Sequence, residues 1–498
     1  MTDKPDKAET QANETSPQVS DDLHVTQHSV RVGGKKLSYT ATTGTIVLKE
    51  EATKKGADEG VFEGERPKAE VFFVAYTLDG VKDKAARPIT FSFNGGPGSS
   101  SVWLHLGLFG PRRVEMRDAE ASQPPYRLTD NDFSLLDTTD LVFIDPVGTG
   151  YSRPVSGEKA GDFHTLKKDV SSVGDFIRLY TGRYGRWESP KFLAGESYGT
   201  TRAAALSGYL QERHGMYLNG LMLISVVLDF TTLLFKTNNL LPYILYIPTY
   251  AATAHYHGRL PQKFQDKPLR EVLDEVEDFT LNVYAPALLK GSSLSERRAV
   301  AKKLSSYTGL SENYIERSDL RIGIMRFTKE LLRDEGRTVG RLDSRFKGAD
   351  RDNVGEIFEF DPSMAAITGP YTATFNHYIR EELGYRSDLA YEILSFDVNK
   401  AWKWETENAH VDVAETLRKA MTMNPHLKVH VANGYFDLAT PHFATEYTFN
   451  TLGLSAELSE NISMSYYEAG HMMYVHPGSL EALYTALRSF VETAAGSA

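Results

Sequence analysis

The pentapeptide GESYG, residues 195–199, places a serine between two glycines, after the apolar run KFLA and before the small-residue run TTRAAALSGYL. A G-x-S-x-G sequence between a strand and a helix is typical of a turn that exposes a nucleophilic serine, and such a tight turn needs small residues beside the serine. The free N–H groups at the start of the following helix would help to stabilise an oxyanion. The pattern therefore predicts a nucleophile at Ser197.

A serine nucleophile needs a base, and the base needs an acid that orients it. LKVHVANGYFDLATP places Asp437 just after one predicted strand, and ISMSYYEAGHMMY places His471 just after the next. The order Ser, Asp, His, with the last two residues after late strands, is that of α/β-hydrolases. Alone, Asp437 would be interpreted as a turn residue and His471 as a core residue. Together with Ser197 they predict a catalytic triad.

The glycine-rich stretch FNGGPGSSS follows the predicted strand ITFSF. It has neither the Gly-Lys-Ser/Thr ending of a P-loop nor the G-x-G-x-x-G pattern of dinucleotide-binding loops. In hydrolases, a loop after an early strand supplies the second N–H group of the oxyanion hole. Adjacent glycines would let this backbone approach the reacting carbonyl, so we expect the stretch to lie beside GESYG.

The segments that position these residues alternate between strand and helix patterns. Antiparallel strands are predicted in SVRVGGKKLSYTATTGTIVL, and another strand is predicted in AEVFFVAYTLDG. Further strands are predicted at ITFSF, TTDLVFID, SPKFLA, NGLMLISVVLD, LKVHVANG and ISMSYYEAG. Helices are predicted over 163–184, over 200–214 and in GSLEALYTALRSFVETAA. This alternation predicts a mainly parallel sheet with helices on both faces, as in the α/β-hydrolase fold.

The alternation is lost between Phe230 and about Thr374, which predicts a large helical cap inserted between two parts of the sheet. The first residues of the chain are polar and offer little to bury. We therefore expect a disordered tail over 1–24, a hydrolase core over 25–229 and 374–498, and a cap over 230–373.

An acidic stretch inside the predicted cap resembles a calcium-binding loop, with Asp350, Asp352, Gly355 and Asp361 at matching positions. However, Val354 falls at a ligand position, and the last ligand is Asp rather than the usual bidentate Glu. A solvated acidic loop is the favoured interpretation, and no metal is expected.

The composition limits the class of partner. The chain has 498 residues, a net charge of −11 and no cysteine. The absence of a basic block argues against nucleic acid, and LLPYILYIPTYAATA is too short and too proline-broken for a membrane helix. The N-terminus has no apolar region typical of a secretory signal. We expect a cytoplasmic protein, with a periplasmic or secreted location as the alternative if the N-terminus is trimmed.

The motifs FNGGPGSSS, DPVGTGYS, GESYG and AGHM, together with G-x-x-D at Gly434 to Asp437, resemble those of the serine carboxypeptidases of peptidase family S10. The resemblance spans roughly Ser92 to Met472. It implies a hydrolase that releases C-terminal amino acids from peptides through an acyl-enzyme, without a cofactor. The implied partner is a peptide with a free C-terminus, neither nucleic acid nor membrane is expected, and a homodimer stays open.

The resemblance also implies a role for each matching residue. Ser197 would attack the carbonyl, His471 would transfer its proton, and Asp437 would orient His471. The backbone N–H groups of Gly96 and Tyr198 would form the oxyanion hole. The positions that bind the substrate carboxylate or line the leaving-residue pocket are Asn94, Gly95, Glu196 and Met472.

One departure from the family concerns the substrate carboxylate. Glu196 can hydrogen-bond a carboxylate only if one of the two groups holds a proton. In the family a second glutamate, eleven residues after the proline of the motif, shares this proton, but Leu108 stands there in this chain. Arg112 or Arg113 could bind the carboxylate instead, although a surface charge pair is the favoured interpretation. We expect a less acidic pH optimum than is usual for the family.

Two other functions fit the same residues. An esterase or acyltransferase stays open, because the fold and the triad do not determine the acyl acceptor. A non-catalytic binding module is less favoured, since such a protein could have lost any member of the set of nucleophile, base, acid and oxyanion glycines.

Overall fold

The computed structural model describes residues 19–54, 59–291, 295–404 and 410–496. Residues 1–18, most of the predicted disordered tail, lie outside this range. The first strand, β1 (Asp22–Val32), already begins inside the stretch that was expected to be disordered.

The N-terminal part of the central sheet is antiparallel. β1, β2 (Lys35–Thr53) and β3 (Phe62–Leu78) are neighbours in sequence order, as the alternating pattern predicts. β3 then pairs antiparallel with β7 (Asp140–Ile144) and with the short β8 (Arg153–Pro154).

The remaining strands of the sheet run parallel. In spatial order they are β7, β4 (Ile89–Phe93), β9 (Lys191–Ser197), β10 (Gly220–Val226), β13 (Lys428–Gly434) and β14 (Ile462–Tyr467). β4, β7 and β10 are buried along their whole length, as expected of strands covered on both faces. The carboxyl ends of parallel strands meet at one edge of the sheet, so the loops after β4, β9, β13 and β14 come together.

Helices cover both faces of the sheet. α2 (Leu166–Arg183), α3 (Tyr198–His214) and α14 (Ala414–Met423) belong to one apolar cluster, which includes Leu193 of β9. α1 (Val102–Leu104), α12 (Pro362–Glu381) and α17 (Pro477–Ala494) belong to the other cluster, which includes Phe192. This arrangement confirms the α/β-hydrolase fold.

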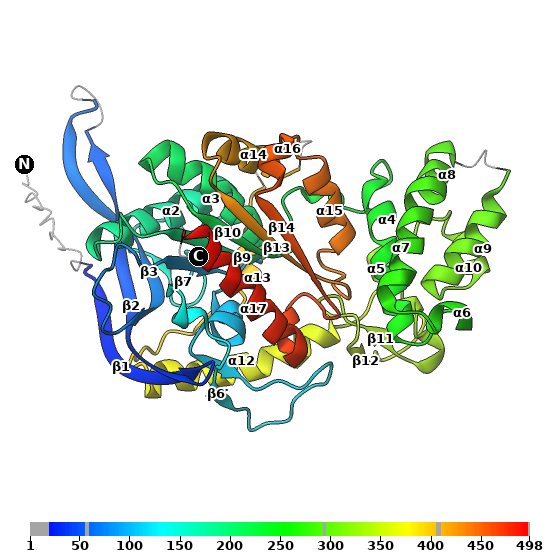
Figure 1. Cartoon of the computed structure of the whole chain (residues 1–498), viewed down its shortest axis with the longest axis horizontal. Helices are drawn as coiled ribbons and strands as arrows, with labels where there is room; N and C mark the ends of the chain where they lie inside the picture. The colour runs from blue at the N-terminus through cyan, green and yellow to red at the C-terminus, as the bar shows by residue number, and fades with distance from the viewer. Residues whose placement is uncertain (1–18, 55–58, 292–294, 405–409, 497–498) are drawn as a thin grey trace, which may run out of the picture.

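A separate group of helices lies to one side of the sheet (Figure 1). These cap helices are α4 (Leu241–Leu245), α5 (Ile247–Tyr256), α6 (Gln262–Gln265), α7 (Leu269–Phe279), α8 (Ala285–Lys290), α9 (Arg297–Thr308), α10 (Glu312–Arg317) and α11 (Ile324–Glu330). Their buried side chains form a cluster of their own, termed the cap cluster, which also contains Tyr435, Phe436 and Leu438 from the loop after β13. The cap therefore packs directly on that loop.

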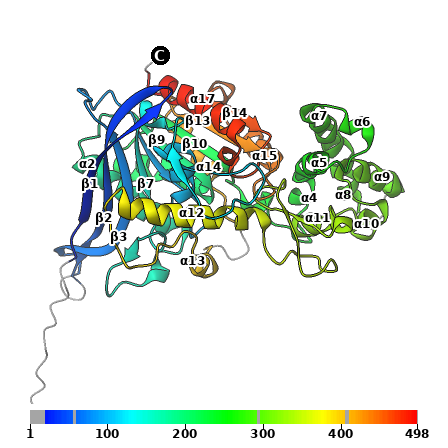
Figure 2. The same ribbon diagram turned by 90° about the horizontal axis from the view of Figure 1, so that it is seen from below.

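The predicted end of the insertion, residue 373, falls inside α12. A short ribbon of β11 (Thr338–Val339) and β12 (Lys347–Gly348) precedes this helix. Figure 2 shows α12 lying across the sheet, between the N-terminal strands and the cap helices. Tyr371 and Phe375 of α12 are buried in the cluster on that face of the sheet. The helix therefore packs as part of the core, and the helical insertion ends before it.

The acidic loop at 350–361 is mostly exposed, as the solvated interpretation predicts, but both of its ends are anchored to the rest of the fold. The Asp350 side chain forms a buried ion pair with Lys329, and Asp361 caps α12 by accepting from the N–H of Ser363 at 3.0 Å. In the part of the chain that the structure describes, no group of three or more His, Cys, Asp or Glu residues could hold a metal ion. No helix in the described ranges combines the length and the apolar character needed to cross a membrane.

Candidate active site

Ser197 lies at the junction of β9 and α3, with a strained backbone of φ 60° and ψ −131°. Residues other than glycine rarely adopt such a conformation, which costs on the order of 1–3 kcal/mol. The flanking glycines leave the space that this turn requires. A Cβ on Gly195 would lie 2.2 Å from the carbonyl oxygen of Gly199, and a Cβ on Gly199 would lie 2.8 Å from that of Phe93. The strand, the turn and the helix occur where the pentapeptide predicts them.

The loop after β4 packs against the serine turn. A Cβ on Gly95 would lie 2.5 Å from the backbone nitrogen of Tyr198, so only glycine allows this contact. Gly96 follows with a φ of 100° and lines the same cavity as Ser197. The contact brings together the two loops whose N–H groups, at Gly96 and Tyr198, are predicted to form the oxyanion hole.

His471 and Asp437 form a buried pair. Nδ1 of His471 lies 2.7 Å from Oδ2 of Asp437, and the two side chains are 6% and 0% exposed. Asp437 also accepts from the N–H of Ala439 at 2.7 Å and from the N–H and hydroxyl of Thr440 at 3.0 and 2.7 Å. Burial lowers the pKa of His471, but the charge and hydrogen bond of Asp437 outweigh it and raise this pKa above its usual value. The pair is thus suited to hold a proton.

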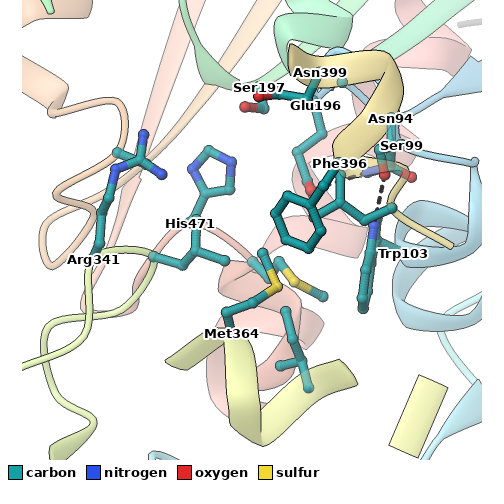
Figure 3. Close-up of a pocket in the computed structure, with 17 residues that line it drawn as sticks. Asn94, Ser99, Trp103, Glu196, Ser197, Arg341, Met364, Phe396, Asn399 and His471 are labelled. Carbon is teal, nitrogen blue, oxygen red and sulfur yellow. Dashed lines mark hydrogen bonds between the residues drawn. The ribbon is translucent and has the colours of Figure 1, made fainter. Parts of the chain in front are cut away.

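Ser197 and His471 line one cavity of about 360 Å³. In Figure 3 the imidazole ring of His471 points toward Ser197. No hydrogen bond joins the two side chains in the described structure. Such contacts are often long in an unliganded enzyme and tighten when substrate binds. The structure therefore brings the three predicted triad residues together, with the acid–base contact already formed.

Glu196 and Asn94 lie on another part of the cavity wall. Glu196 is buried, and its two carboxyl oxygens accept from Nδ2 of Asn94 at 3.0 Å and from the hydroxyl of Tyr474 at 2.6 Å. Oδ1 of Asn94 accepts from the N–H of Leu104 at 3.0 Å, which orients the amide. Burial raises the pKa of Glu196 to about 7, against the opposing effects of His471, Tyr474 and Asn94. Glu196 can therefore hold a proton near neutral pH.

Tyr474 was not identified from the sequence, although it lies only three residues after His471. Its ring packs so closely on Gly107 that a Cβ there would lie 2.3 Å from a ring carbon. Leu108 is buried in the neighbouring apolar cluster and does not line the cavity. Glu196 thus has a tyrosine hydroxyl as its partner, whereas the family resemblance implies a second glutamate.

The rest of the cavity wall is mainly apolar. Met472, predicted from the resemblance, lines it, together with residues that no motif indicated. Among these, Trp103 donates from Nε1 to the hydroxyl of Ser99 at 2.8 Å, which fixes the indole on the wall (Figure 3). The others are Arg341, Leu342, Met364, Ile367, Leu394, Phe396, Asn399 and Ala439. Most come from the segment before α12, from α12 itself and from the region of α13 (Phe396–Ala401).

Arg112 and Arg113 do not line the cavity. Both lie on β5 (Arg112–Val114), and Arg112 forms ion pairs with Asp130 and Glu382. The alternative that these arginines bind the substrate carboxylate is therefore wrong, and the charge-pair interpretation is confirmed for Arg112.

Two relatives from Arabidopsis thaliana match short stretches of the chain. Serine carboxypeptidase-like 36 is 27% identical over 151 residues, which is 30% of this chain and 29% of that protein. Serine carboxypeptidase-like 20 is 29% identical over 126 residues, which is 25% of this chain and 24% of that protein. The chain thus matches less than a third of the length of either relative.

A solved structure matches almost the whole fold. It is that of Kex1(delta)p, a prohormone-processing carboxypeptidase from Saccharomyces cerevisiae. The TM-score is 0.53 at 17% identity, over 91% of this chain and 92% of that chain. At this identity the likeness shows the fold alone.

The profile of the family described as serine carboxypeptidase matches residues 59–473. This range contains the Ser197 turn, the loop after β4, the cap helices and the Asp437–His471 pair. A match over most of the chain, on the fold that carries these residues, shows that the chain belongs to the serine carboxypeptidase family.

Proposed function

We propose that this protein is a serine-type carboxypeptidase that releases C-terminal amino acids from peptides through an acyl-enzyme. One observation carries the proposal. The cavity that contains Ser197 and the Asp437-paired His471 also contains a buried glutamate, Glu196, hydrogen-bonded to Asn94 and Tyr474, and burial raises its pKa to about 7. Ser197, His471 and Asp437 suit acyl transfer, and a protonated Glu196 suits a substrate with a free carboxylate.

The chemical step follows from the geometry of the triad. His471 takes the hydroxyl proton of Ser197 as its Oγ attacks the last peptide carbonyl, and Asp437 stabilises the resulting imidazolium. The N–H groups of Gly96 and Tyr198 donate to the oxyanion. His471 then gives its proton to the leaving amino group, the C–N bond breaks, and water hydrolyses the ester on Ser197.

The free carboxylate of the substrate would bind at Asn94 and Glu196. Asn94 has two amide hydrogens, and Glu196 accepts only one of them. A protonated Glu196 can donate to the carboxylate, whereas an ionised one would repel it. The apolar wall beside them, including Met472 and Ile367, suits an apolar side chain on the leaving residue.

The experiment compares a blocked dipeptide that has a free C-terminal carboxylate with its amide and its methyl ester, between pH 4 and 8. We expect the free acid to be preferred over the amide, and Ser197→Ala to lower kcat by at least about 10³-fold. A preference for the ester, or indifference to the terminus, would make the protein an esterase or acyltransferase. Full activity in folded Ser197→Ala would overturn the mechanism.

A further inference from the structure

Arg341 lines the active-site cavity with a guanidinium group that has no ion pair or hydrogen bond among the described residues. It is exposed, and on the described cavity wall it is the only Lys or Arg. The nearby Arg345, by contrast, is buried in ion pairs with Asp343 and Asp118. Arg341 is therefore free to bind an anionic group that enters the cavity.

The backbone at Arg341 is fixed to both halves of the acid–base pair. The carbonyl of Arg341 accepts from the N–H of Leu438, the residue after Asp437, at 3.1 Å. The carbonyl of the next residue, Leu342, accepts from the N–H of His471 at 2.7 Å. Asp361 also accepts from the N–H of Arg341 at 3.1 Å. The fold thus sets the position of Arg341 relative to the reacting groups.

Arg341 and the carboxylate-binding residues lie on opposite sides of His471. Figure 3 shows Arg341 beyond the imidazole ring, well separated from Asn94 and Trp103. A substrate whose carboxylate lies at Asn94 places its leaving residue on that side of Ser197. Its acyl part then extends from Ser197 toward Arg341.

We propose that Arg341 selects peptides with an acidic side chain on the residue just before the scissile bond. The inference rests on the proposed carboxypeptidase function, and it names the substrate class of that site. Arginine is charged at every working pH, and its planar fork suits a carboxylate. The pKa of His471 is raised overall, but burial and, to a smaller extent, the Arg341 charge act to lower it, so Arg341 lies within electrostatic reach of the reacting groups.

The test measures kcat/KM at pH 6 for blocked dipeptides Glu-Phe, Gln-Phe and Lys-Phe with free carboxylates. We expect the wild type to prefer Glu over Gln by roughly 5-fold, a preference that added salt weakens. In R341Q this ratio falls to about 1, and R341E prefers the Lys substrate. R31Q, which removes an exposed arginine on β1, is the matched control and keeps the wild-type ratio. Because the Glu/Gln ratio compares two substrates of the same variant, any effect of the substitution on His471 that is common to both substrates cancels.

An unchanged Glu/Gln ratio in R341Q would overturn the proposal. A second series, Gln-Glu against Gln-Gln, varies the leaving residue, and a change confined to that series would overturn the assignment to the acyl side. The Glu/Gln pair is also measured as methyl esters. If the wild type cleaves only the esters, the proposed carboxypeptidase function is wrong. The Glu/Gln ratio measured with the methyl esters still shows whether Arg341 selects an acidic side chain.

Discussion

In the proposed carboxypeptidase, the protonation state of Glu196 would control whether the cavity binds a free carboxylate. Burial raises its pKa from 4.5 to about 7 in the folded protein. The group is therefore protonated below pH 7 and loses its proton as the pH rises through this value. If Glu196 binds the substrate carboxylate as proposed, binding would persist to a higher pH than a carboxyl group of ordinary pKa would allow.

This residue leads to a prediction on pH dependence. KM for a free-acid peptide should rise as the pH increases through 7, by about tenfold for each pH unit above it. KM for the corresponding amide should not follow this rise. In Glu196→Gln the side chain is neutral at every pH, so the rise for the free acid should disappear. A KM for the free acid that is independent of pH in the wild type would contradict carboxylate binding by Glu196.

Tyr474→Phe provides the second variant of the same experiment. The Tyr474 hydroxyl donates to Glu196 and favours its ionised form. Its removal raises the pKa of Glu196, so the rise in KM should move to higher pH. A purely structural role for Tyr474 would change the activity without moving this pH profile.

Ser197, Asp437 and His471 could be predicted from the sequence because each lies in a short motif at the end of a strand. The partner of Glu196 could not. Tyr474 and Glu196 are 278 positions apart, and their contact depends on the space that Gly107 leaves for the tyrosine ring. Such a contact follows from packing and leaves no local pattern. Arg341 was missed for the same reason.

At the scale of elements, the serine turn is a contact between two loops as well as a junction of β9 and α3. Gly199 faces the backbone of Phe93 and Asn94, and Gly95 faces that of Tyr198. Because these neighbours are backbone atoms, they cannot rotate away as a side chain would. The active-site geometry therefore depends on glycine on both sides of the contact.

Gly199→Ala tests this contact. The added Cβ would force β4 and α3 apart, which should destabilise the protein by about 2–4 kcal/mol and strongly lower activity. Thermal unfolding and hydrolysis of the free-acid dipeptide measure the two effects. Gly161→Ala is the control, because a Cβ there meets nothing within 4 Å, and its stability should change by no more than about 0.5 kcal/mol. Equal melting temperatures for the two variants would show that the loops can separate freely.

Most of the elements could be predicted, because strands covered on both faces are apolar runs. α12 was not predicted from the sequence, for a physical reason. Gly369 and Pro370 form a dipeptide that usually interrupts a helix, yet α12 continues through them. Burial of Tyr371 and Phe375 against the sheet stabilises the continuous helix, and this tertiary effect cannot be seen in the local sequence.

At the scale of the whole molecule, two buried histidines make the fold sensitive to acid. Burial lowers the pKa of His105 to about 3 and that of His430 to about 4, from 6.5. Below pH 6.5 the unfolded chain binds protons that the folded protein does not. The stability due to each neutral histidine is therefore complete above pH 6.5 and is lost as the pH falls through this range.

His430→Gln should make the protein less sensitive to acid. His430 lies between the hydroxyls of Ser463 and Ser465, at 2.8 and 3.0 Å, and a glutamine can still bond to one of them. The loss of stability between pH 6.5 and 4 should be smaller in the variant, by up to about 3 kcal/mol. Melting temperatures across this pH range measure it. His426→Gln, at an exposed position, should follow the wild type, and a parallel profile for His430→Gln would contradict the prediction.

The cap cluster includes Phe436 and Leu438, the residues on either side of Asp437. One turn thus serves both as a part of the cap interior and as the support of the predicted triad acid. In a chimera that carries the cap of another family member, the side chains that pack on this turn would differ from those of the present cap cluster. Such a chimera should lose turnover through a displaced Asp437, although helices α4 to α11 do not themselves line the active-site cavity in the described structure. An exchange of caps that keeps the enzyme active therefore requires that residues 435–438 be exchanged together with the cap.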